Sequence, residues 1–352
     1  MKRTVRARSA DSSSTAIAGL FGNPVKHSVS PLIHNRAIEE LGLDMQYIPF
    51  EVDRTSLAEA IENARALGLV GFNVTHPLKE AIIPHLDRLT DTASAVKAVN
   101  TVALSSGKLV GYNTDASGLI NALRLFASFS MAGKRAVVIG SGGAARAAVF
   151  GFLEEGSSDL TILARNEAAA DEIAKEMRAI FSSASLSVEN LYGDAKRLRA
   201  AVARADLIVN ATPIGMGANE QGRHPMISSN SPAAGRLWAN LLASESESCE
   251  PFRRRPPCLV LDLVYFPLET ALLEKARALG HPTLNGLTHL VCQAGLSFEI
   301  WTGRRFDERR MMSWLEARNK MECSPGSQNK TELESGTELE SGTDRTRQTE
   351  ER

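Results

Sequence analysis

A glycine-rich turn is the part of this 352-residue sequence whose residue types point most directly to chemistry. Residues 140–145 read Gly-Ser-Gly-Gly-Ala-Ala and fit the pattern G-x-G-x-x-A. In this pattern the first glycine permits a tight turn, the second lets the backbone approach a pyrophosphate, and the N-terminus of the next helix stabilises the negative charge. The sequence therefore predicts a dinucleotide-binding turn formed by Gly140, Ser141, Gly142, Gly143 and Ala144.

The end of the strand that follows distinguishes NAD from NADP. An acidic residue at this point holds the ribose 2′-hydroxyl of NAD, whereas a cation binds the 2′-phosphate of NADP. Here Arg165 follows the strand, and the nearest acid, Asp159, stands at its beginning. Arg165 therefore favours NADP, with NAD as the alternative cofactor and a solvated arginine as the alternative interpretation.

A strand–helix–strand unit must position these residues. The apolar run 135–140 predicts a buried strand, the stretch up to Glu155 a helix that Gly156 ends, and residues 159–164 a second strand. The same alternation continues towards the C-terminus and indicates an α/β fold with a parallel, Rossmann-type sheet. It predicts further strands at 207–210 and 259–264, helices at 195–203 and 268–279, and two last helices within 286–317 that break near Gly303.

Polar motifs surround this unit in a fixed order. They are FGNPVKHSVSPLIHN from Phe21, GFNVTHPLKE from Gly71, AVNT from Ala98, GYNTD from Gly111, NATPIGM from Asn210, DLVY from Asp262 and NGLTHLVCQA from Asn285. In order and spacing the set closely resembles the shikimate dehydrogenase family, from about Ile17 to Gly303. Because the resemblance rests on seven separate motifs, chance does not explain it.

This resemblance implies a two-domain oxidoreductase that uses NADP to reduce 3-dehydroshikimate reversibly to shikimate, a step of chorismate and aromatic amino acid biosynthesis. It implies an N-terminal α/β substrate-binding domain built from residues 16–115 and 288–320. It places a Rossmann-type NADP-binding domain at 116–287, across a cleft. The C-terminal helices would return to the substrate domain.

Hydride transfer needs a partner that removes the hydroxyl proton, because the cofactor supplies only the redox chemistry. The resemblance implies that Lys79 and Asp115 are this catalytic pair. A lysine is a poor base at its reference pKa of about 10.4, so we interpret the two as a coupled group. Lys79 relays the proton, while Asp115 orients it and accepts a substrate hydroxyl. The alternatives are an exposed cation after a turn and a helix N-cap.

The resemblance also implies which side chains bind the substrate and the rest of the cofactor. Amides of this kind also brace protein cores, and a structural role stays open above all for Asn73 and Tyr265. The pair Ser30-Pro31 also predicts the start of an amphipathic helix, with Ser30 as its N-cap and Pro31 as its first residue. The implied substrate-binding residues are Ser28, Ser30, Asn73, Thr75, Asn100, Tyr265 and Gln293, and the implied further cofactor-binding residues are Thr212, Gly286 and His289.

Three departures separate this chain from the family. His289 stands where the family usually has a methionine beside the nicotinamide, and Ala164 where an asparagine often precedes the phosphate-binding arginine. His289 has three interpretations: it stacks on the cofactor, it titrates near neutral pH, or it is an accommodated polar replacement. The third departure is the segment 217–257, which fits neither the helical nor the strand period and reads as an irregular insertion.

Composition and charge exclude several other classes of protein. Forty Lys and Arg against 41 Asp and Glu give a net charge of −1 and no overall field for nucleic acid or anionic membranes. The longest apolar stretch, 136–153, contains Arg146 and four glycines and falls short of a spanning helix. The four cysteines and seven histidines show no metal-ligand spacing. We therefore expect a small-molecule substrate, no nucleic acid, no membrane, no metal, and a monomer or homodimer.

Both ends of the chain differ in composition from the middle. Residues 1–15 carry basic residues but no apolar core, which excludes a secretory signal and leaves organelle targeting as an alternative to the cytoplasm. Residues 321–352 carry eight acids, four bases and no aromatic residue. Such a segment buries too little apolar surface to offset its ordering entropy. We predict a flexible N-terminus and a disordered acidic tail.

Two alternatives to the main function stay open. One is an NAD-dependent quinate/shikimate dehydrogenase, since the two acids differ by a single hydroxyl. The other is a non-catalytic relative that senses a metabolite of the pathway. Intact Lys79 and Asp115 and the glycine turn count against it.

Overall fold

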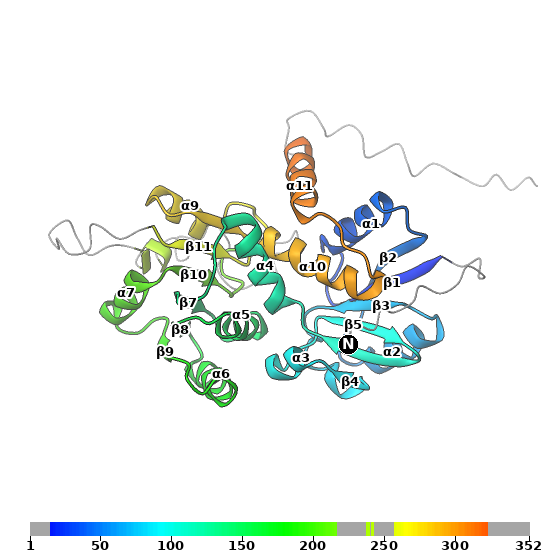
Figure 1. Cartoon of the computed structure of the whole chain (residues 1–352), viewed down its shortest axis with the longest axis horizontal. Coiled ribbons are helices and arrows are strands. Elements are labelled where there is room, and N and C mark those ends of the chain that lie inside the picture. Colours follow the sequence, from blue (N-terminus) through cyan, green and yellow to red (C-terminus); the bar gives the residue numbers. More distant parts are fainter. Residues whose placement is uncertain (1–14, 217–236, 240, 243–256, 323–352) are drawn as a thin grey trace, which may run out of the picture. The chain divides into compact units, whose positions relative to one another are not determined.

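The computed structural model describes residues 15–216, 237–239, 241–242 and 257–322 (Figure 1). The predicted flexible N-terminus, most of the insertion 217–257 and the acidic tail from residue 323 lie outside the described residues. Within them the chain forms two six-stranded sheets, which confirms the predicted α/β class. None of the described helices is long and apolar enough to cross a membrane.

The first sheet comes from the N-terminal block and is mixed in direction. Its strand order is β2-β1-β3-β5-β6-β4, with β1 parallel to β2 and β3, and with β5 antiparallel to β3 and β6. The strands are β1 (Ala16–Gly22), β2 (Met45–Glu51), β3 (Gly71–Val74), β4 (Arg88–Leu89), β5 (Thr101–Ser105) and β6 (Lys108–Tyr112). The helices of this block are α1 (Ser30–Glu40), α2 (Leu57–Ala66), the short 3₁₀ helix η1 (Ile83–His85) and α3 (Asp91–Val96).

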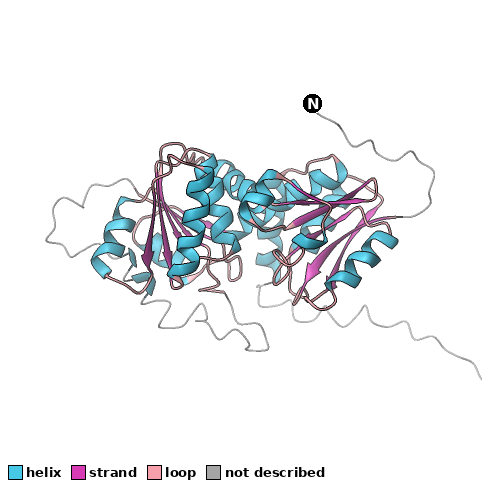
Figure 2. Ribbon diagram, turned by 90° about the horizontal axis from the view of Figure 1, so that it is seen from below, coloured by secondary structure: helices cyan, strands magenta, loops and turns pink. Residues whose placement is uncertain are grey.

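The second sheet is parallel throughout and confirms the predicted Rossmann-type unit. Its order is β12-β11-β10-β7-β8-β9, and Figure 2 shows helices on either side of its strands. The strands are β7 (Arg135–Ile139), β8 (Asp159–Ala164), β9 (Leu186–Asn190), β10 (Leu207–Asn210), β11 (Leu259–Asp262) and β12 (Thr283–Asn285). The helices are α5 (Gly143–Glu154), α6 (Glu167–Ile180), α7 (Ala195–Arg204) and α9 (Ala271–Ala278).

Both faces of the second sheet are buried, which explains its continuous apolar strands. Successive side chains of a strand point to opposite faces. Accordingly, Ala136 and Val138 belong to one apolar cluster, and Val137 and Ile139 belong to another. A sheet covered on both faces exposes its functional groups only at its edges and ends, and the loops at the carboxyl ends of the strands carry the predicted nucleotide motifs.

Two helices link the motifs of the two blocks. Helix α4 (Asp115–Ala127) follows the first sheet, and helix α10 (Gly286–Thr302) follows β12 and packs against α4. At the far end of α10, the indole nitrogen of Trp301 donates to the carbonyl of Val102 in β5 at 2.9 Å. Helix α10 therefore returns to the N-terminal block, as predicted. It ends at Gly303 in the left-handed conformation, and α11 (Glu308–Glu322) follows.

Some sequence predictions were wrong in detail. Helix α1 begins at Ser30 with Val29 as its N-cap, so Ser30 does not cap it; the hydroxyl of Ser28 instead accepts the main-chain hydrogen bond of Ser30 at 3.2 Å. Strand β11 ends two residues earlier than predicted, and α11 includes residues 321–322, which had been assigned to the tail.

The irregular reading of 217–257 was wrong for its described part. Residues 237–239 and 241–242 are helical, and Trp238, Leu241 and Leu242 are buried in the core of the second sheet. These three apolar residues follow the i, i+3, i+4 spacing of a helix. The prolines and serines on either side hid this short amphipathic run.

A glycine sets the distance between α4 and α10, which yields a stability prediction. A Cβ on Gly118 would lie 2.7–2.9 Å from the Cβ, Cα and N of Gln293. We expect Gly118→Ala to lower the free energy of unfolding by roughly 1–3 kcal/mol, because overpacking outweighs the gain in helix propensity. Urea denaturation measures the change.

The matched control is Gly151→Ala in α5, where the nearest atom to the added Cβ is the carbonyl oxygen of Ala116 at 3.2 Å. This contact is tight but not prohibitive, and helix propensity then favours alanine by up to about 1 kcal/mol. Equal destabilisation of the two variants would contradict the role given to Gly118.

Candidate functional site

The predicted catalytic pair forms an ion pair. Lys79 Nζ lies 2.7 Å from Asp115 Oδ2, and their side chains are 31% and 10% exposed. Lys79 lies in the segment after β3, where its carbonyl accepts a hydrogen bond from the main-chain nitrogen of Val99 at 2.8 Å. Asp115 is the first residue of α4. The structure thus brings the two residues together from separate motifs.

The surroundings of Asp115 favour its charged form. Burial raises the pKa of this carboxyl, but the charges of Lys79 and His289 and the hydrogen bonds from Lys79 and Asn100 outweigh burial and hold the pKa below its usual range. The N-terminal position in α4 also favours a negative charge. The carboxylate therefore stays ionised at neutral pH and loses its charge only in acid.

A cluster of amides and hydroxyls surrounds the pair. The side-chain nitrogen of Asn100 donates to Asp115 Oδ1 at 2.8 Å and to Thr114 Oγ1 at 2.9 Å, and Asn100 Oδ1 accepts from the main chain of Thr114 at 2.8 Å. The side-chain oxygen Oε1 of Gln293, on α10, accepts from the side-chain nitrogen of Asn100 and from the hydroxyl of Thr114, both at 3.3 Å. Three predicted residues, Asp115, Asn100 and Gln293, are thereby linked.

A second layer supports this cluster. The side-chain nitrogen of Asn73 donates to the carbonyl of Asn100 and the hydroxyl of Thr101, both at 3.0 Å, and to Ser297 Oγ at 3.1 Å. The side-chain oxygen Oδ1 of Asn73 accepts from the Tyr47 hydroxyl at 2.7 Å. All hydrogen-bonding groups of Asn73 therefore have protein partners, and the residue is buried.

The sequence analysis missed four members of these two layers. Thr101 and Thr114 adjoin predicted residues within their motifs, so adjacency was a usable signal. Ser297 lies one helical turn after Gln293 and contacts Thr101 at 2.7 Å. Tyr47 alternates with exposed positions in β2, and nothing in that alternation indicates a polar role.

The remaining predicted substrate residues lie outside these hydrogen-bonded layers. Ser28 and Ser30 are at the start of α1, and Ser30 is buried. Thr75 follows β3, and its main-chain nitrogen donates to the carbonyl of Phe21 at 2.9 Å. Tyr265 follows β11, and burial raises the pKa of its hydroxyl.

The glycine turn has the geometry that a pyrophosphate requires. Gly140 has a φ of 124°, which only glycine adopts readily, and an added Cβ would lie 3.1 Å from the carbonyl oxygen of Ala211. No atom lies within 4 Å of a Cβ added to Gly142 or Gly143, so the turn is open on that side. The N-cap of α5 is Gly142, without a side-chain cap, which leaves the first main-chain N–H groups as donors for a phosphate.

Neighbouring predicted residues have definite positions. Thr212 lies on the loop after β10, where its main-chain nitrogen and its hydroxyl both donate to Asn210 Oδ1, at 3.1 and 2.6 Å. Ser141 lies in the glycine turn, and Ala144 lies in the first turn of α5. Gly286 begins α10 so close to the carbonyl of Leu263 that a Cβ would lie 2.3 Å away. Close packing is therefore a second reason for a glycine at position 286.

The two residues that bear on the 2′-position of the ribose lie as predicted. Asp159 is at the beginning of β8, where its carboxylate accepts from the hydroxyl of Ser185 at 2.8 Å. Arg165 immediately follows the end of β8 and is exposed. The carboxyl end of the strand, on the side of the glycine turn, therefore carries a cation.

His289 lies in the first turn of α10. Its Nε2 is 3.1 Å from the main-chain carbonyl oxygen of Asp115. Burial lowers the pKa of His289 below its ordinary value, which the charge of Asp115 and this contact partly counteract and the charge of Lys79 lowers further. The departure from the family pattern therefore lies directly at the catalytic pair.

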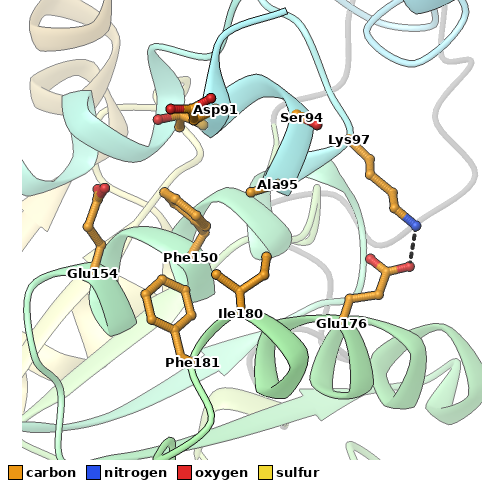
Figure 3. A pocket seen from close by; sticks show the side chains of 10 residues that line it. Asp91, Ser94, Ala95, Lys97, Phe150, Glu154, Glu176, Ile180 and Phe181 are labelled. Atoms are coloured by element: carbon orange, nitrogen blue, oxygen red, sulfur yellow. Dashed lines mark hydrogen bonds and ion pairs between the residues drawn. The ribbon is translucent and has the colours of Figure 1, made fainter.

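The structure also has a cavity that lies away from the predicted site residues. It has a volume of about 570 Å³ and lies among α3, α5 and α6, with an apolar floor that includes Phe150 and Phe181 (Figure 3). At one side Lys97 pairs with Glu176 Oε1 at 2.6 Å. None of its lining residues is a predicted site residue. In the parts of the chain that the structure describes, no three His, Cys, Asp or Glu side chains group to hold a metal.

Comparisons with known proteins show which protein family this chain is similar to. A family model described as "Shikimate dehydrogenase substrate binding domain" matches residues 20–102, and one described as "Shikimate / quinate 5-dehydrogenase" matches residues 122–219. A Geobacter metallireducens protein named shikimate dehydrogenase (NADP(+)) is 39% identical over 289 residues, which cover 82% of this chain and 92% of that protein.

Solved structures show the same likeness. A shikimate 5-dehydrogenase of Listeria monocytogenes, crystallised with shikimate and NAD, has 31% identity and a TM-score of 0.72, covering 86% of this chain and 96% of the other. A ligand-free 5-ketofructose reductase of Gluconobacter also has 31% identity, with a TM-score of 0.70, covering 87% and 100%. From the matched family models and the identity to its relatives over most of its length, the chain belongs to the shikimate dehydrogenase family.

Proposed function

We propose that this protein is an NADP-dependent shikimate dehydrogenase, which catalyses the reversible reduction of 3-dehydroshikimate to shikimate. The observation that carries the proposal is the 2.7 Å pair of Lys79 and Asp115, set in a cluster of buried amide and hydroxyl groups. Such a cluster suits a substrate with several hydroxyls and one carboxylate. The relatives named shikimate dehydrogenase (NADP(+)) support the same activity.

The proposed mechanism divides the reaction between cofactor and protein. Bound NADP⁺ would supply the hydride acceptor for the carbon that bears the reacting hydroxyl. The ammonium group of Lys79 first releases a proton to solvent, and its neutral amine then takes the proton of that hydroxyl. In the reverse direction the ammonium group gives this proton to the new alkoxide. Asp115 holds the Lys79 nitrogen in place and accepts a hydrogen bond from a second substrate hydroxyl. This relay is our interpretation of the pair's geometry.

The proposed substrate-binding roles follow from which side chains border the Asp115 carboxylate. We propose that Asn100 and Gln293 contact ring hydroxyls, because both border the Asp115 carboxylate. Ser28, Ser30, Thr75 and Tyr265 remain our proposal for the carboxylate and the outer hydroxyls, on the resemblance of their motifs. Asn73 instead braces Asn100 from behind, because its side chain donates to the main-chain carbonyl of Asn100 and its other partners are Tyr47, Thr101 and Ser297 rather than Asp115.

The cofactor-binding roles rest on the open glycine turn. We propose that residues 140–144 and the first turn of α5 hold the pyrophosphate, with Thr212, Gly286 and His289 further along the cofactor. Arg165 holds the 2′-phosphate. Residues 16–115 and 288–320 then form the substrate-binding domain and 116–287 the NADP-binding domain. The compartment we predict is the cytoplasm, and a monomer or homodimer is the expected state.

The direct test follows reduced nicotinamide by its absorbance. Purified protein is mixed with shikimate, quinate or, in the reverse direction, 5-ketofructose, each with NADP(H) and NAD(H). We expect the largest kcat/KM for shikimate with NADP⁺. A preference for quinate with NAD⁺ would support the alternative dehydrogenase. No turnover with any pair across pH 6–10 would indicate a non-catalytic relative.

Removal of the ammonium group tests the catalytic pair. We expect Lys79→Met to lower kcat by a factor of about 10²–10⁴, the usual contribution of a positioned acid–base group, with a smaller change in KM. The matched control is Lys97→Met, which removes a lysine paired to a carboxylate at 2.6 Å but far more exposed. Exposed pairs contribute little, so activity should persist. A Lys79→Met enzyme with unchanged kcat would refute the assignment.

Substitution of Arg165 tests the cofactor assignment. Because a hydrogen bond to a charged group contributes about 1.5–3 kcal/mol, Arg165→Ser should raise the KM for NADP⁺ by roughly ten- to a hundredfold. The KM for NAD⁺ should change little, since NAD⁺ lacks the 2′-phosphate. The control is Arg197→Ser in α7, an exposed arginine whose carboxylate partner, Glu189, is 4.0 Å away. Parallel changes for both cofactors would argue against phosphate recognition by Arg165.

A further inference from the structure

The position of His289 goes beyond the catalytic pair. Helix α10 brings its first turn against the start of α4, where His289 Nε2 lies 3.1 Å from the carbonyl oxygen of Asp115. A carbonyl oxygen only accepts, so Nε2 carries the proton of this hydrogen bond. The neutral ring therefore has its second nitrogen, Nδ1, unprotonated.

Nδ1 is accessible to protons. No hydrogen bond to it occurs among the described residues, and it is not one of their buried, unpartnered polar atoms. His289 is itself only partly buried. The ring can therefore titrate without a change of fold.

Two charged groups act on this ring. The carboxylate of Asp115, from α4, favours its protonation, and the ammonium group of Lys79, from the segment after β3, opposes it. On α10 itself the nearest ionisable group is Cys292, and burial raises the pKa of its thiol to about 12, so it stays neutral. Protonation of His289 would thus place a second cation beside the Lys79–Asp115 pair, where it competes with Lys79 for the carboxylate.

We propose that His289 is a positioning residue, whose neutral imidazole holds the main chain of Asp115 and whose protonation sets the acid limit of 3-dehydroshikimate reduction, the direction in which Lys79 starts as the ammonium group. This inference rests on the proposed function, because Asp115 must work with Lys79 for its position to matter. It assigns a role to the residue at which this chain departs from the family pattern. The fall in activity towards acid pH then reports the charge of His289 before that of Asp115, since an aspartate has the lower reference pKa.

The first experiment measures the pKa of His289 by NMR titration of the ring in the free protein, and needs no substrate. In Lys79→Met the pKa should rise, because a repelling cation is removed. In Asp115→Asn it should fall, because an attracting anion is removed. We expect changes of about half a unit or more in each direction. His281, whose Nδ1 accepts from the main chain of Cys258 at 3.2 Å, is the control and should not shift.

The second experiment measures the reduction of 3-dehydroshikimate, in which Lys79 starts protonated and does not itself produce an acid limb. It compares the pH profiles of kcat/KM for the wild-type protein, His289→Gln and His289→Leu, each scaled to its own plateau. The Gln variant keeps an N–H donor for the Asp115 carbonyl and the Leu variant does not, but neither side chain titrates. In both, the acid limb should move to lower pH by about half a unit or more. Only the Leu variant should also lose positioning, seen as a lower plateau kcat than that of the Gln variant.

The outcomes separate the inference from the proposed function. If the wild-type protein does not oxidise shikimate, the proposed function fails, and the NMR shifts alone decide whether His289 is coupled to the pair. An acid limb that stays in place in His289→Gln would overturn the inference even with full activity. Shifts of His289 that are absent, or equal to those of His281, would overturn it as well.

Discussion

The close packing of α4 on α10 is the constraint on which the site depends. Helix α4 begins with Asp115, and α10 carries His289 and Gln293, so the distance between the helices decides whether these side chains meet. Gly118 keeps that distance short, because any larger residue would overlap the backbone of Gln293. Two helices that are far apart in the sequence thereby act as one support. The Asp115 carboxylate is positioned by helix packing rather than by a loop.

Placing a carboxylate in this packed region has an electrostatic cost that its partners offset. Burial alone would raise the pKa of Asp115 and neutralise it. The ammonium group of Lys79, the amide of Asn100 and the N-terminus of α4 together keep it ionised. Each of these partners is held in place by a hydrogen bond or by its position at the end of a strand. The polar layer behind them, centred on Asn73, therefore serves the charge of Asp115 although it does not touch it.

The sequence predicted four strands of the second sheet, but not β9 or β12, and it predicted the polar layers only in part. Parallel strands buried on both faces are apolar runs between turns, so the bounds of β8 and β10 could be found from composition alone. The pairing of Thr101 with Ser297 could not, because 196 residues separate them and only the return of α10 brings them together. The helical turn around Trp238 escaped for another reason. It is too short for a periodic signal to exceed the surrounding prolines and serines.

A site built on two packed helices also restricts how it can vary. A substitution at Asp115 or Lys79 removes a charge that the other residue needs, and leaves the remaining charge partly buried and unpaired. Position 289 is different, because its contact is with a main-chain carbonyl that every residue at 115 presents. The side chain there can change without breaking the ion pair, while its charge still acts on the pair. Position 289 is therefore where this fold can adjust the electrostatics of the Lys79–Asp115 pair without replacing either residue.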